Sequence, residues 1–278
     1  MSAHLGGSHL AEHHRLPWSV LSRGDVVEIH GPPSCGKTHL IYLLLIICIT
    51  PREHQSILVG GWDKAGIVFD MDGSFDITRF NRLLLGRLKR MFSSNIHAQT
   101  VAQRSLERLH IFRPSSSTQL ATTLTQLGRY HAAHLSGVEI GLIAIDSINA
   151  YHWPDRFIVE QVQTSSLTRK ALPPLRILTA LSSLRATHAP VIMMTSRDLQ
   201  ATIHGAPPSL ISTHHITLSA HHVSRFQQGM PIATAKVEEK DHGRERVEII
   251  ASMQILKYST VNDFSFHITG NEFEVAGW

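Results

Sequence analysis

Few short motifs dictate a local fold as strictly as the octapeptide Gly-Pro-Pro-Ser-Cys-Gly-Lys-Thr at residues 31–38. It matches the phosphate-loop pattern G-x-x-x-x-G-K-[ST] at every fixed position. The sequence predicts a short apolar strand at 26–30 before it and a buried helix at 36–49 after it. A strand, a glycine-rich loop and a helix in this order form a phosphate cradle. The candidate nucleotide-binding residues are Gly31, Pro32, Pro33, Ser34, Cys35, Gly36, Lys37 and Thr38.

Each part of this loop has a distinct expected role. Gly31 permits a sharp turn, and Gly36 permits close approach of the backbone to a phosphate. Lys37 is expected to reach the β- and γ-phosphates, and the Thr38 hydroxyl is expected to bind Mg²⁺. The sequence therefore predicts ATP and Mg as cofactors, with Lys37 also a candidate catalytic residue.

Two residue types in the loop need a separate reading. Pro32 and Pro33 remove two backbone donors, but the amides nearest the phosphates come from residues 34–38. Cys35 is either an oxidisable thiol or a small neutral residue, and we favour the second reading. Cys35 and Cys48 are the two cysteines of the chain, too few for a disulfide scaffold, which predicts a reducing compartment.

Carboxylates follow two of the predicted buried strands. Asp146 comes directly after the apolar segment 140–145, where a second Mg²⁺ anchor beside a phosphate loop is expected, and it is a candidate catalytic residue. The alternative is an aspartate that caps the next turn. Asp70 and Asp72 follow the segment 65–69, and either carboxylate could polarise an attacking water. Because Asp72–Gly73 is also a turn dipeptide, a purely structural role stays open.

Alternating apolar and helical segments predict an α/β fold, with a mostly parallel sheet flanked by helices. Predicted strands lie at 26–30, 65–69, 109–112, 140–145 and 191–194, and predicted helices at 36–49, 76–92, 118–134 and 173–188. Asp76 is placed to cap the start of the second of these helices. After residue 213, alternating segments at 213–219, 232–239, 246–256 and 264–275 predict antiparallel strands at the C-terminal end. Gly270–Asn271 offers a two-residue turn, which predicts a hairpin within the last segment. We expect a short tail at residues 1–23 and one core domain at 24–278.

Composition excludes several classes of protein. The chain has 278 residues, of which 42% are hydrophobic and 17% charged, so it can bury a large core and is not expected to be disordered. Its longest apolar run, at 40–49, is shorter than the roughly 20 residues of a membrane-spanning helix. A soluble, intracellular protein is expected. The 20 histidines show no metal-binding spacing, and we attribute them to composition.

The order of the motifs resembles a known family. The phosphate loop is followed by Phe-Asp-Met-Asp-Gly-Ser-Phe at 69–75, by Arg-Pro-Ser-Ser-Ser-Thr at 113–118 and by Ile-Asp-Ser-Ile-Asn-Ala at 145–150. Over residues 24–200 the chain resembles the RecA-type recombinases, and within their eukaryotic Rad branch the recombinase paralogues. The resemblance implies a RecA-like P-loop ATPase core. It further implies an accessory or mediator role in homologous-recombination repair of DNA double-strand breaks.

The resemblance also implies partners and a location. Such paralogues assemble with another RecA-like recombinase paralogue in a hetero-oligomer, and the main recombinase is a second candidate partner. Single-stranded or branched DNA would be bound through the complex, no membrane partner is expected, and the location would be the nucleus.

Two departures from active recombinases put efficient hydrolysis in doubt. Those enzymes carry Glu where this chain has Asp72, which makes Asp72 the third candidate catalytic residue, although its carboxylate is one methylene shorter. They also carry an amide sensor, usually Gln, where this chain has Ser196 or Arg197. The family's N-terminal helical domain is not expected, since only about 25 residues precede the first strand. We therefore expect ATP binding with weak, or DNA- and partner-dependent, hydrolysis.

Basic residues gather where the family faces DNA. Residues 161–197 contain five cations and no acid, and the family's two DNA-facing loops would fall at 152–168 and 197–212. Tyr151 and Trp153 could stack on bases. The candidate DNA-binding residues are Arg156, Arg169, Lys170 and Arg197. A solvated helix face is the alternative.

Three other functions stay open from the sequence. The chain could be a scaffold subunit with a vestigial nucleotide site, an autonomous DNA-dependent ATPase, or a small-molecule kinase. The antiparallel ending and the segment 145–156 argue against a kinase. The short N-terminal tail argues against an autonomous filament, which needs a motif that docks on its neighbour.

Overall fold

The predicted strand–loop–helix unit is present, with the phosphate loop joining β1 (Val26–His30) to α1 (Lys37–Ile49). These elements come from a computed structural model that describes residues 21–162, 173–196, 212–220, 231, 234, 247–258, 260–269 and 273–275. Every α1 residue from Leu40 to Ile49 is buried, so the longest apolar run of the chain forms a core helix. Within the described residues, no helix is both long and apolar enough to cross a membrane.

A nine-stranded sheet carries the fold within the described residues, in the order β11-β10-β9-β8-β1-β7-β6-β4-β5. Its other strands are β4 (Ala65–Asp70), β5 (Leu109–Phe112), β6 (Ile140–Asp146), β7 (Val191–Thr195), β8 (His214–Ala220), β9 (Val247–Ile255), β10 (Thr260–Ile268) and β11 (Phe273–Val275). The six strands from β8 to β5 pair in parallel, and β9, β10 and β11 pair antiparallel. The carboxyl ends of the parallel strands therefore meet at one edge.

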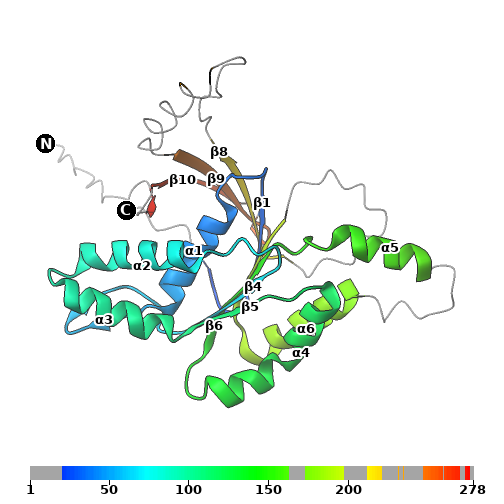
Figure 1. The fold of residues 1–278 in the computed structure, drawn as a ribbon, viewed down its shortest axis with the longest axis horizontal. Coiled ribbons are helices and arrows are strands. Elements are labelled where there is room, and N and C mark those ends of the chain that lie inside the picture. Colours follow the sequence, from blue (N-terminus) through cyan, green and yellow to red (C-terminus); the bar gives the residue numbers. More distant parts are fainter. Residues whose placement is uncertain are drawn as a thin grey trace, which may run out of the picture.

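Helices cover both faces of the parallel strands (Figure 1). One face packs against α1, α2 (Ile77–Met91) and α3 (Asn95–Leu106), and the other packs against α4 (Ser117–His134) and α6 (Pro173–His188). β1 contributes side chains to the hydrophobic core on both faces of the sheet, because successive side chains of a strand point to opposite faces. Val27 and Ile29 lie in the core beneath α1, and Val26 lies in the core beneath α4 and α6. The predicted class, a mostly parallel sheet flanked by helices with antiparallel strands at its end, is confirmed.

The structure differs from the predicted elements in a few places. The segment predicted as the first antiparallel strand is β8, which pairs antiparallel with β9, as predicted, but in parallel with β1 on its other side. The sequence also missed α3, the small hairpin of β2 (Glu53–His54) and β3 (Ile57–Leu58), and α5 (His152–Val162). These elements bury few apolar side chains, so their hydrophobic periods are weak. The segment 232–239 lies largely outside the described residues.

The C-terminal hairpin follows its prediction. Phe266 pairs with Val275 and Ile268 with Phe273 in antiparallel register. Phe266 and Val275 are buried, and they close the core beneath α1 against β9. The predicted turn at Gly270–Asn271 lies outside the described residues.

Candidate nucleotide-binding site

The phosphate loop owes its shape to its two glycines. Gly31 and Gly36 have φ of 152° and 88°. A Cβ on Gly31 would lie 2.6 Å from Sγ of Cys35 and 2.7 Å from the carbonyl oxygen of Leu218. A Cβ on Gly36 would lie 2.3 Å from Cδ1 of Ile249. Both positions exclude larger residues, so the loop is packed closely against the sheet.

Lys37 and Cys35 lie inside the curve of this loop. Nζ of Lys37 donates to the carbonyl oxygens of Gly31 at 2.6 Å and of Pro32 at 2.8 Å. It also lies 3.7 Å from Sγ of Cys35. The Cys35 side chain is buried, which suits the small neutral residue that we favoured from the sequence. The ammonium group is therefore held over the loop, where an added phosphate group would offer it a stronger acceptor.

Asp146 receives hydrogen bonds from two hydroxyls. Thr38 donates to Oδ2 at 2.6 Å, and Thr195 donates to Oδ1 at 2.5 Å. The carboxylate is buried, and this burial is the main cause that raises its pKa. The two hydroxyls lower the pKa, whereas the negative charges of Asp72 and Asp70 raise it further. A divalent cation would offset both the burial and the repulsion.

The hydroxyl of Thr38 and the carboxylate of Asp146 are oxygen ligands of the kind that Mg²⁺ prefers. In the described part of the chain, no three His, Cys, Asp or Glu side chains are grouped to hold a metal ion. Mg²⁺ beside a phosphate loop is held through one or two protein oxygens and the phosphates of the substrate. The residues present thus fit a nucleotide with Mg²⁺.

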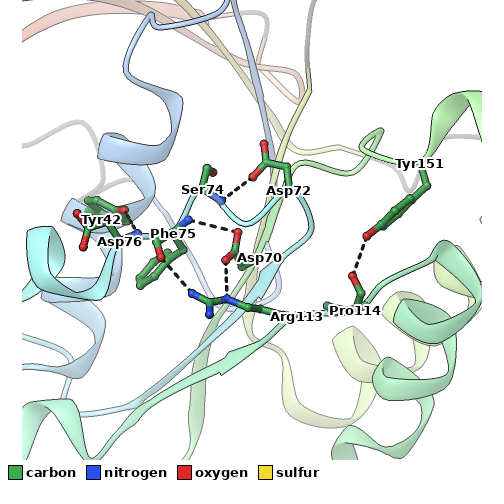
Figure 2. A network of polar contacts seen from close by, with 9 residues as sticks. All are labelled: Tyr42, Asp70, Asp72, Ser74, Phe75, Asp76, Arg113, Pro114 and Tyr151. Atoms are coloured by element: carbon green, nitrogen blue, oxygen red, sulfur yellow. Dashed lines mark hydrogen bonds and ion pairs between the residues drawn. The ribbon is translucent and has the colours of Figure 1, made fainter.

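Asp70 and Asp72 lie at the end of β4 but have different partners (Figure 2). Asp70 faces Asp146 across the parallel β4–β6 pair. Its carboxylate is buried and accepts from Nε of Arg113 at 3.0 Å and from the backbone N–H of Phe75 at 3.3 Å. Asp70 therefore holds the loop, which leaves Asp72 as the carboxylate that could act on a water.

Asp72 is exposed, and its Oδ1 accepts from the backbone N–H of Ser74 at 3.1 Å. It therefore closes the turn that the sequence offered as its structural role. Its carboxylate nevertheless lies close enough to Asp146 to raise the pKa of that residue. The Asp72 carboxylate thus stabilises the turn and also lies near Asp146, beside the phosphate loop.

The residues after this turn are fixed on the other side by α1 and α2. Asp76 caps α2, as predicted, by accepting from the backbone N–H groups of Thr78 and Arg79. The backbone N–H of Asp76 donates to the hydroxyl of Tyr42 at 2.8 Å. Residues 70–76, here called the carboxylate loop, are therefore tied to three elements: β4, α1 and α2 (Figure 2).

The candidate DNA residues divide between described and undescribed parts of the chain. Arg156 lies on α5, where its Nε donates to Glu160 at 2.8 Å and its Cζ lies 5.8 Å from the centre of the Trp153 ring. Trp153 is 66% exposed. The hydroxyl of Tyr151 donates to the carbonyl oxygen of Pro114 at 3.0 Å. Arg169, Lys170 and Arg197 lie outside the described residues.

The chain aligns with proteins named for DNA repair. The DNA repair protein XRCC2 homolog of Arabidopsis thaliana is 28% identical over 211 residues, which are 66% of this chain and 56% of that protein. The mouse DNA repair protein XRCC2 is 32% identical over 133 residues, which are 48% of this chain and 43% of the mouse protein. The chain is similar to the XRCC2-like RAD51 paralogues.

A more distant relative agrees with this placement. The human DNA repair protein RAD51 homolog 2 is 22% identical over 125 residues, which are 45% of this chain and 29% of that protein. No protein-family model matches the chain. The chain spans about half the length of the XRCC2 relatives it matches. The predicted resemblance to recombinase paralogues is confirmed, and so is the RecA-like fold class.

Against the expected RecA-like site, the structure adds one group of residues that the sequence reasoning missed. Ser196, at the expected place of the amide sensor, has its hydroxyl 2.6 Å from Nδ1 of His30. Nε2 of His30 lies 3.2 Å from Glu28, and Oε1 of Glu28 accepts from the hydroxyl of Ser212. Glu28 and His30 alternate with apolar residues in β1, and this pattern could have identified them as a polar pair on one face.

Proposed function

We propose that this chain is an ATP-binding recombinase paralogue that assists homologous-recombination repair of DNA double-strand breaks. The observation that carries the proposal is the convergence of Lys37, Thr38 and Asp146 at the end of β1 and β6. The similarity to proteins named for DNA repair supports the biological role. A location in the nucleus follows from that role.

In this proposal the loop amides and the start of α1 hold the phosphates of ATP. Lys37 would exchange its bonds with the carbonyls of Gly31 and Pro32 for bonds with phosphate oxygens, which are the stronger acceptors. Thr38 and Asp146 would hold Mg²⁺, which screens the phosphate charge when bound. Asp72 would orient a water, with reduced efficiency because its side chain is short.

Calorimetric titration with ATP and MgCl₂ tests the nucleotide part of the proposal. Lys37→Ala is expected to weaken ATP binding by at least about tenfold, since it removes a charged hydrogen-bond donor. Lys89→Ala, which removes an exposed lysine of α2, is the matched control and should bind as the native chain does. Equal affinity of the two variants would refute the assignment of Lys37.

A vestigial nucleotide site in a scaffold subunit is the second candidate, favoured by the short carboxylate of Asp72 and by Ser196 at the sensor position. The two candidates differ in whether ATP matters to repair. Cells that lack the protein should regain double-strand break repair with the native chain but not with Lys37→Ala. Full rescue by Lys37→Ala would favour the scaffold.

We propose that the chain acts in a hetero-oligomer with another RecA-like recombinase paralogue, with the main recombinase as a further partner. The resemblance to RAD51 paralogues supports this. Affinity purification from cells followed by mass spectrometry should recover a second RecA-like paralogue in comparable amount. Recovery of the chain as a homo-oligomer alone would contradict it.

DNA binding within that complex is assigned to α5 and the segments that flank it. Trp153 presents an exposed aromatic face, and Arg156 supplies a charge beside it. Arg169, Lys170 and Arg197 are further candidates by sequence. Single-stranded binding through stacking and phosphate contacts would depend strongly on salt concentration.

A further inference from the structure

Residues 113–118, here called the bridging segment, contact two regions that lie far apart in the sequence. One is the carboxylate loop at the nucleotide site, and the other is α5. The bridging segment comprises the connection from β5 to α4 and the first two residues of α4, and it contains none of the phosphate-loop residues or the proposed Mg²⁺ ligands. Its contacts therefore need an explanation of their own.

On the carboxylate-loop side, Arg113 makes two contacts at once (Figure 2). Its Nε donates to the buried carboxylate of Asp70 at 3.0 Å, and a terminal nitrogen donates to the carbonyl oxygen of Phe75 at 3.4 Å. The planar guanidinium thus spans both ends of the turn that carries Asp72. A shift of Arg113 would move that turn.

On the α5 side, the bridging segment makes two further hydrogen bonds. The carbonyl oxygen of Pro114 accepts from the hydroxyl of Tyr151 at 3.0 Å, and the hydroxyl of Ser117 donates to Oδ2 of Asp155 at 2.5 Å. Ser117 is buried. The two bonds fix consecutive turns at the start of α5, whose outward residues Trp153 and Phe157 are exposed.

These contacts are adjacent in the chain. The side chain of Arg113 holds the carboxylate loop, and the carbonyl group of the next residue, Pro114, holds Tyr151. Proline fixes the backbone angle φ of residue 114, which restricts the movement of the two attachment points relative to each other. A displacement of the carboxylate loop or of Tyr151 is therefore transmitted to the other through the restrained backbone of residues 113–114.

We propose that Arg113 and Tyr151 are positioning residues that couple the carboxylate loop to α5. Binding of a nucleotide at the phosphate loop would change the order of α5. Binding of DNA to α5 would in turn change the order of the carboxylate loop, because coupling between two sites is reciprocal. The regulatory meaning rests on the proposed function, in which α5 faces DNA.

Hydrogen–deuterium exchange without any nucleotide tests the coupling itself. Tyr151→Phe removes only the hydroxyl that donates to Pro114, and exchange at residues 70–76 is expected to rise by about twofold to tenfold. Tyr130→Phe is the matched control. The hydroxyl of Tyr130 lies 2.9 Å from His110 on β5, away from the hydrogen bonds of the bridging segment to the carboxylate loop and to α5. Unchanged exchange at 70–76 in Tyr151→Phe, or an equal rise in Tyr130→Phe, would overturn the proposal.

A second measurement adds a non-hydrolysable ATP analogue with Mg²⁺. In the native chain, residues 31–38 should become protected and exchange at 152–162 should change. In Tyr151→Phe the protection of 31–38 should remain while the response of 152–162 is lost. A response that persists would overturn the coupling. Absence of protection at 31–38 in the native chain would instead refute nucleotide binding, and the measurement without nucleotide would still decide the coupling.

Discussion

The hydroxyl of Thr38 donates a hydrogen bond of 2.6 Å to Asp146, a residue 108 positions away in the chain. The bond joins the first turn of α1 to the last residue of β6, and it places two oxygen ligands beside the phosphate loop. Burial and the nearby charges of Asp70 and Asp72 make ionised Asp146 unfavourable without a cation. In the proposed function, Mg²⁺ bound at this pair would therefore also stabilise the protein.

Asp146→Asn should separate the effect of the Asp146 charge on protein stability from its effect on Mg²⁺ binding. The raised pKa means that the folded chain binds this proton more tightly than the unfolded chain, so the ionised form lowers stability at neutral pH. A neutral amide removes that penalty, and Tm without nucleotide should be equal or higher. The rise in Tm that ATP and Mg²⁺ give the native chain should disappear. Retention of that rise in Asp146→Asn would show that Asp146 does not hold Mg²⁺.

Asp72→Glu should raise ATP turnover. The added methylene advances the carboxylate by about 1 Å, and a misplacement of that size can reduce a rate by about a hundredfold. Steady-state phosphate release with single-stranded DNA and Mg²⁺ is expected to rise by tenfold or more, to about that limit.

Asp72→Asn is the control for this prediction, because it keeps the oxygen that accepts from Ser74 but removes the negative charge. Its turnover should fall below that of the native chain, with ATP affinity unchanged. If Asp72→Glu and Asp72→Asn give the same rate, the carboxylate takes no part in hydrolysis and residue 72 serves the turn alone.

Local sequence patterns predicted most of the fold and the phosphate loop, but they did not predict contacts between residues that lie far apart in the sequence. Asp76 was identified as a cap because the signal lies within three residues of the helix it starts. The pairing of β8 with β1 could not be read, since strand direction depends on residues far apart in the sequence. The Asp70–Arg113 pair bridges 43 positions, so the sequence, which named Asp72 as the candidate catalytic carboxylate, could not show that Asp70 is held by an arginine.

Glu28 should give the chain a pH-dependent stability. The hydrogen bond with His30 is the largest influence on this carboxyl and lowers its pKa below 4.5; burial opposes this, and Ser212 and His215 lower it further. A lowered folded-state pKa contributes stability that is present above pH 4.5 and is lost as the pH falls through the folded pKa.

Thermal unfolding from pH 7 to about pH 3.5 measures this contribution. Glu28→Gln should have a lower Tm than the native chain at pH 7, and the difference should shrink below pH 4.5 as native Glu28 becomes protonated. Glu53→Gln, an exposed glutamate of the β2–β3 hairpin, should follow the native curve. A constant difference at every pH would mean that charge on Glu28 is not the cause.

Trp153→Ala should weaken binding to a short single-stranded oligonucleotide, because stacking of one base on an aromatic ring contributes about 1–3 kcal/mol. At least about a fivefold rise in Kd is expected by fluorescence anisotropy at low salt. Tyr258→Ala is the matched control: Tyr258 is also 66% exposed and also carries a cation over its ring, with Nζ of Lys257 at 5.1 Å, but it lies beyond the end of β9. Since folding should survive the loss of either exposed ring, a selective loss in Trp153→Ala assigns the contact to α5. An equal loss in both variants would point to a general surface effect, and no loss in either would remove Trp153 from the DNA-binding surface.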